Sequence, residues 1–138
     1  WGTMLVPGMW ELNGYGDAEY VNSGFAWRGH FNDMPPAVPV KDNHVGSYRK
    51  TVSIPADWDG KQVIAHFGSV TSCIYLYVNG EFAGYAEDSK VAAEFDITPY
   101  VHTGDNLITF QTFRWCDGSW CEDQDFWRLT DRQRQCEP

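Results

Sequence analysis

The feature that most constrains the fold is a hairpin signal in the middle of the chain. In the stretch "SCIYLYVNGEFAGYAE", residues 72–87, Asn79-Gly80 separates two apolar runs. Asn and Gly tolerate the positive φ angles that a type I′ turn requires, so this dipeptide between apolar runs predicts two antiparallel strands. An antiparallel sheet is therefore the first expectation for this chain.

Three further segments show the two-residue period of strands that are buried on one face. In residues 46–55, Tyr48, Val52 and Ile54 share one face, opposite a polar face that consists of Ser47, Arg49, Thr51 and Ser53. Residues 61–70 place Val63, Ala65 and Phe67 on one side. Residues 107–115 place Ile108 and Phe110 on one face, and Leu107 and Phe113 on the other.

The segments between these strands are short and rich in turn residues. We expect "AEFDITPYV", residues 93–101, to be a short ordered connection, and "TGDN", residues 103–106, to be a turn. No helical period of any length interrupts the pattern. Strands at such short intervals predict an all-β fold, a β-sandwich.

The first 44 residues differ from the rest of the chain. They are rich in Gly, Pro and Asn without sustained alternation, yet they carry many aromatic side chains that are costly to leave in water. We expect a long ordered loop over the sandwich, and long ordered loops are often functional.

Length and charge narrow the class of protein. A chain of 138 residues fits one domain. Its formal net charge of -9 repels phosphate backbones, and its apolar runs are far shorter than a membrane helix, so we expect neither nucleic acid nor membrane as a partner. Because it begins at Trp1 without a leader, we expect a processed chain or an internal segment, which leaves the compartment open between cytoplasm and periplasm.

The cysteines and histidines show no metal motif at the level of sequence. There is no CxxC pair, and the four histidines lack the spacing of zinc ligands. Cys73, inside "SCIYLYV", is expected to be a small buried hydrophobe. Whether Cys116 and Cys121 form a disulfide in a short loop is left open.

The stretch "RWCDGSWCEDQDFWRL", residues 114–129, concentrates acids and tryptophans. Asp123 and Asp125 point the same way if the stretch is extended, which allows three interpretations. They are the acid and base of an inverting glycosidase, ligands of a hard cation, or loop carboxylates bonded to the backbone or to water. The neighbouring aromatics favour a carbohydrate ligand, because sugars stack their C–H faces on aromatic rings.

Six blocks of sequence carry a resemblance to a known family, and they occur in the same order between Leu5 and Leu129. The chain resembles the N-terminal sugar-binding domain of glycoside hydrolase family 2, and is most similar to its β-galactosidases. That resemblance implies a jelly-roll, galactose-binding-domain-like β-sandwich without catalytic residues, whose loops reach the active-site pocket of a later (β/α)₈ barrel. The blocks are "VPGMWELNGYG", "YVN", "PPAVP", "NHVGSYRKTVSIPADW", "HFGSVTSCIYLYVNGEFAGYAEDSKVAAEFDIT" and "RWCDGSWCEDQDFWRL".

The resemblance also implies the site residues. Asn22, in "YVN", corresponds to an asparagine that bonds galactose hydroxyls. Asp125, the second acid of "EDQD", corresponds to a carboxylate that meets the galactosyl 6-hydroxyl and helps to hold a sodium ion, while Glu122 and Asp123 shape the loop. Mg²⁺ belongs to the absent catalytic domain in this family, and we expect this domain alone to require no cofactor.

The resemblance sets the expected domain bounds and function. Residues 1–130 form the sugar-binding domain, whereas residues 131–138, "DRQRQCEP", depart from the family and are expected to be a disordered tail. A (β/α)₈ barrel needs about 250 residues, so we expect the chain alone to be inactive and to bind galactosides weakly. Its expected partner is the catalytic barrel domain; the alternatives are an autonomous carbohydrate-binding module, a small glycosidase and a structural domain.

Overall fold

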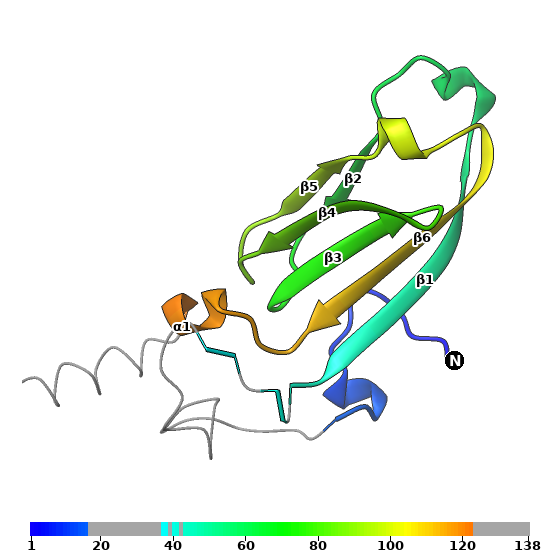
Figure 1. The fold of residues 1–138 in the computed structure, drawn as a ribbon. Helices are drawn as coiled ribbons and strands as arrows, with labels where there is room; N and C mark the ends of the chain where they lie inside the picture. The colour runs from blue at the N-terminus through cyan, green and yellow to red at the C-terminus, as the bar shows by residue number, and fades with distance from the viewer. Residues whose placement is uncertain (17–36, 39, 42, 123–138) are drawn as a thin grey trace, which may run out of the picture.

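Antiparallel strands dominate the structure of the chain (Figure 1). This computed structural model describes residues 1–16, 37–38, 40–41 and 43–122, except for the side chains of Trp120 and Glu122. The strands are β1 (Val45–Ile54), β2 (Ile64–Phe67), β3 (Cys73–Val78), β4 (Glu81–Glu87), β5 (Ala93–Asp96) and β6 (Gly104–Phe113). The helical pieces are the short turns η1 (Glu11–Asn13), η2 (Ala56–Trp58), η3 (Thr98–Tyr100) and α1 (Gly118–Glu122). No helix in the described part of the chain has the length and apolarity to cross a membrane.

The strands form two sheets. The larger has the order β1-β6-β3-β4, and the smaller consists of β2 and β5. Strand β6 is central, because it pairs with β1 from Gly104 to Phe113 and with β3 from Ile108 to Phe113. Strands distant in sequence therefore meet through β6.

The hydrophobic core lies between the two sheets. Ile74, Leu76 and Val78 project from β3 and are almost completely buried. They pack against Phe95 of β5, beside Val63 and Ile97. The ring of Phe67 in β2 meets the ring of Phe110 in β6 edge to face, at 5.4 Å between centroids. Burial of this set on both inner faces is what holds the sandwich together.

The structure confirms the all-β jelly-roll sandwich expected from the sequence. The alternation along β1 and β2 is observed, with Tyr48, Val52 and Ile54 less exposed than their neighbours. Asn79 and Gly80 have φ angles of 53° and 89°, the positive pair that a type I′ turn needs.

Two expectations for the connecting segments are wrong. Residues 93–96 are not a plain connection but strand β5, which pairs with β2. Residues 104–106 are not part of a turn but the start of β6, paired with the end of β1. Gly104 has a φ of 91°, so the glycine that resembles a turn signal introduces a strand.

A buried amide network joins the β3–β4 turn to the start of β6. Asn106 is 1% exposed. Its Oδ1 accepts hydrogen bonds from Asn79 Nδ2 (2.9 Å) and the His102 amide (2.9 Å), while its Nδ2 donates to the carbonyls of His102 (2.7 Å) and Gly104 (2.8 Å). Asn79 in turn donates to the Tyr100 carbonyl. The network satisfies polar groups that burial would otherwise penalise.

We expect Asn106→Ala to lower the free energy of unfolding by about 1 to 3 kcal/mol, because it leaves buried donors and acceptors without partners. Urea unfolding followed by circular dichroism measures the change. The matched control is Asp105→Ala, at the exposed preceding position of the same strand. Equal midpoints for the two variants would contradict the structural role of Asn106.

Candidate functional site

The residues predicted to contact sugar and sodium, Asn22 and Asp125, lie outside the described residues, as does Asp123. The structure does describe the segments from which the chain leaves toward them. These are residues 1–16 and Asn43 around the first, and residues 114–122 before the second. Three anchors fasten these described segments to the sandwich.

The first anchor is an extension of the β1–β6 ladder by a side chain. Beyond the strands, the Arg114 amide donates to the His44 carbonyl at 2.9 Å. Asn43 then replaces a peptide group: its Nδ2 donates to the Trp115 carbonyl at 3.0 Å, and its Oδ1 accepts from the Trp115 amide at 2.9 Å. This two-point contact fastens the segment before β1 to the segment after β6.

The second anchor holds the N-terminal segment against β1. The indole N–H of Trp10, which precedes η1, donates to the hydroxyl of Tyr48. The Tyr48 ring stacks on Phe110 with 4.7 Å between centroids. A Cβ atom at Gly46 would come within 2.5 Å of the Trp10 ring, so only glycine lets the indole lie on the strand.

The third anchor fastens the α1 turn to the ends of β3 and β4. The Cys116 amide donates to Ser119 Oγ at 3.1 Å, and the Cys116 thiol donates to the Ser72 carbonyl at 3.7 Å. The Gly118 amide donates to the Glu87 carboxylate at 3.3 Å. Residues 116–118 thus contact Ser72, directly before β3, and Glu87, the last residue of β4.

All three anchors lie at one end of the sandwich. Figure 1 shows η1 and α1 at the end of the larger sheet where β1 begins and β6 ends. The opposite end carries η2 and η3. The two segments that lead toward the predicted site residues therefore leave the described part of the fold from a common end.

Two buried thiols, those of Cys73 and Cys116, lie beside the third anchor. Cys73 is 3% exposed, which confirms the expectation that it is buried, and Cys116 is 5% exposed. The hydrogen bond from Cys73 lowers the pKa of Cys116 to about 6, whereas the same contact, with burial, raises the pKa of Cys73. Cys116 and Cys121, whose pairing was left open, are both free thiols.

Acidic side chains adjoin this thiol pair, and sequence reasoning missed the group. Glu87, Cys116 and Asp117 each bring one potential metal-ligand atom, and these atoms lie within 4.8 Å of one another. A two-residue hairpin turn alone would pair Cys73 with Ala86. A register shift between Leu76 and Tyr77 places Glu87 opposite Cys73 instead, and no signal in the sequence announces it.

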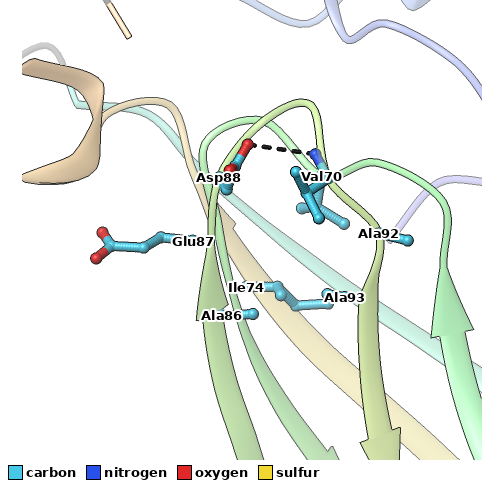
Figure 2. A pocket seen from close by; sticks show the side chains of 8 residues that line it. Val70, Ile74, Ala86, Glu87, Asp88, Ala92 and Ala93 are labelled. Carbon is cyan, nitrogen blue, oxygen red and sulfur yellow. Dashed lines mark hydrogen bonds between the residues drawn. The ribbon is translucent and has the colours of Figure 1, made fainter. Parts of the chain in front are cut away.

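A hollow lies on the other side of β4 from the Glu87 side chain. Figure 2 shows this hollow of about 170 Å³, whose lining includes Val70, Ile74, Ala86 and Ala93. The Asp88 carboxylate at its rim is engaged by the amides of Lys90 and Val91, at 2.9 and 3.2 Å. The side chain of Glu87 points away from the hollow (Figure 2). The lining contains no aromatic ring, and the Asp88 carboxylate is already bonded to backbone amides, so the hollow does not suit a sugar, which needs a flat ring face and several hydroxyl partners.

The chain is similar to family 2 glycosyl hydrolases over most of its length. The family model described as "Glycosyl hydrolases family 2, sugar binding domain" matches residues 2–137. The chain is 45% identical over 130 residues to the β-galactosidase of Halalkalibacterium halodurans and 43% identical to that of Priestia megaterium. Each match covers 94% of this chain but 13% of the relative. The β-glucuronidase of Bacteroides uniformis superposes with a TM-score of 0.50 at 25% identity, over 52% of this chain and 9% of the other.

We expect Asn43→Ala to destabilise the chain by about 1 to 3 kcal/mol, since it removes both hydrogen bonds to the Trp115 peptide group. Hydrogen exchange should show faster exchange of the Trp115 amide in this variant. Asn13→Ala is the control, because the Asn13 side chain makes an exposed hydrogen bond to the Met9 carbonyl. Unchanged exchange at Trp115 would show that Asn43 does not fasten the two segments.

Proposed function

The chain belongs to the sugar-binding domain family of the family 2 glycosyl hydrolases, and we propose that it is the non-catalytic domain of a β-galactosidase-like enzyme. In this proposal, Asn22 and Asp125 extend from the sandwich into a galactoside pocket that a separate (β/α)₈ catalytic domain completes. The chain spans 13% of the length of the β-galactosidases cited above, which leaves room in such a protein for the barrel.

The common position of the anchors supports this proposal most directly. Trp10 on β1, the Asn43–Trp115 contact and the α1 turn on β4 all lie at the same end of the sandwich. Two loops that begin at one end of a domain can contribute to one pocket without distortion of the sheet. Anchors at opposite ends would have argued against the proposal.

The chemistry of the two side chains suits a sugar. An asparagine amide both donates and accepts, as a hydroxyl does. An ionised carboxylate accepts hydrogen bonds from hydroxyls more strongly than a neutral group. Carboxylate oxygen is also the donor that hard cations prefer, so Asp125 fits the role of one sodium ligand among several oxygen atoms.

The proposal assigns no bond cleavage to this chain. A barrel of about 250 residues does not fit within the 138 present. A hydrogen bond to the Asn22 amide contributes about 0.5 to 1.5 kcal/mol, and one to the Asp125 carboxylate about 1.5 to 3 kcal/mol. The loss of translational and rotational freedom on association opposes this sum of about 2 to 4.5 kcal/mol, and a Kd of 1 mM corresponds to roughly 4.1 kcal/mol. We therefore expect galactose to bind to the isolated chain with a Kd above about 1 mM.

We expect a titration of the ¹⁵N-labelled chain with galactose to shift amide resonances around Asn22 and Asp125 without reaching saturation at about 1 mM. Asn22→Ala and Asp125→Ala should each reduce these shifts, because each removes hydrogen bonds to the sugar. Nitrophenyl-galactoside should not be hydrolysed by the chain.

Glucose, which differs in the orientation of one hydroxyl, is the matched control for non-specific effects. Saturation well below 1 mM would favour the alternative of an autonomous carbohydrate-binding module. Shifts confined to the η2 end would contradict the proposed site, and turnover that Asp125→Ala abolishes would contradict the non-catalytic assignment.

A further inference from the structure

Four ionisable side chains outside the proposed sugar site meet beside the α1 turn. Cys73 of β3 and Glu87 of β4 are directly paired residues, so their side chains share one face of the sheet. The thiol of Cys116 forms hydrogen bonds to the Ser72 carbonyl and to Cys73. Asp117 follows Cys116 at the start of the α1 turn. Three separate stretches of chain thus bring two sulfur donors and two carboxylates together.

The distances suit a small metal ion. The ligand atoms of Glu87, Cys116 and Asp117 lie within 4.8 Å of one another, and the Cys73 thiol is in contact with that of Cys116. A tetrahedral zinc ion, with bonds of about 2.0 to 2.3 Å, holds its ligands within about 4 Å of one another. Rotation of exposed carboxylate side chains can supply the remaining approach.

Burial and hydrogen bonding organise the group. Both thiols are buried, whereas Glu87 and Asp117 are exposed, so the group has a fixed base and an open rim. The Glu87 carboxylate accepts hydrogen bonds from the Gly118 amide (3.3 Å) and the Tyr85 hydroxyl (3.2 Å). Supporting hydrogen bonds of this kind orient metal ligands. Glu87 also borders the hollow, but its side chain points away from the apolar residues there (Figure 2).

The donor types select the class of ion. Hard cations such as Na⁺, Mg²⁺ and Ca²⁺ take oxygen ligands, whereas thiolate sulfur favours softer ions. Two sulfur and two oxygen donors suit a borderline ion with tetrahedral preference. We propose that Cys73, Glu87, Cys116 and Asp117 form a binding site for a thiophilic divalent cation of the Zn²⁺ class.

A bound ion would act on the segment that leads to Asp125. It would link β3 and β4 to residues 116–117, and so fix the α1 turn more firmly than the Gly118 and Ser72 contacts do alone. Because such a site forms only in the folded chain, metal binding would add to folding stability.

Co²⁺ is the probe, because tetrahedral thiolate coordination gives it a charge-transfer absorption. The full chain is kept reduced with a phosphine, and its free thiols are counted before titration. We expect one Co²⁺ per chain, a thiolate-to-cobalt band that Zn²⁺ abolishes by displacement, and a rise in the thermal midpoint with Zn²⁺. The double variant Cys121→Ser/Cys136→Ser should retain all three effects.

Single substitutions test each class of ligand. Cys116→Ser should remove most of the charge-transfer band, and Cys73→Ser should reduce it. Glu87→Gln and Asp117→Asn preserve side-chain volume and should each weaken Co²⁺ binding at least tenfold. Asp57→Asn, an exposed acid in η2 at the other end of the sandwich, is the matched control and should bind as the unaltered chain does.

Several results would overturn the proposal. These are Co²⁺ binding without a charge-transfer band, a band that persists in Cys116→Ser, and equal affinity in Glu87→Gln, Asp117→Asn and Asp57→Asn. The two carboxylate variants keep the test decisive even if a buried cysteine variant fails to fold. Circular dichroism of each variant checks the fold independently of the metal.

Discussion

Strand β6 is the constraint on which the rest of the structure depends. It pairs with β1 on one side along ten residues and with β3 on the other along six, so it joins segments that are far apart in the chain. Its inner face contributes Ile108 and Phe110 to the core, and Asn106 at its start supports the β3–β4 turn. Its last residues lead into Trp115 and α1. The position of the segment that leads toward Asp125 therefore follows from how one strand is held on both edges.

Much of the fold follows from local sequence, and the wrong expectation for residues 93–96, which form β5, has a physical reason. The Asn79-Gly80 turn and the alternation along β1 and β2 need no tertiary information, because backbone conformation and half-burial produce them directly. Strand β5 is short, and only Phe95 in it is buried. It is stabilised by pairing with β2 and by the fit of the Phe95 ring against Gly84, where a Cβ would approach within 2.5 Å. Such contacts between distant segments produce no periodic pattern of apolar residues in the sequence.

The candidate site could be predicted only through family resemblance. No spacing or period singles out Asn22 or Asp125, and their assignment rests on blocks of sequence shared with the family. The thiol and carboxylate group could not be predicted at all. Its geometry depends on a one-residue shift in the β3–β4 register, which exchanges Ala86 for Glu87 opposite Cys73. A shift of this kind reflects packing on both faces of the sheet, which alternation alone does not report.

The Asn43–Trp115 contact has a mechanical consequence. A single amide side chain couples two connecting segments that do not share a strand, and it does so outside the hydrophobic core. A displacement of one segment would therefore act on the other through these two hydrogen bonds, without a change in the sandwich. At this point neither segment can move away from the other unless both hydrogen bonds break.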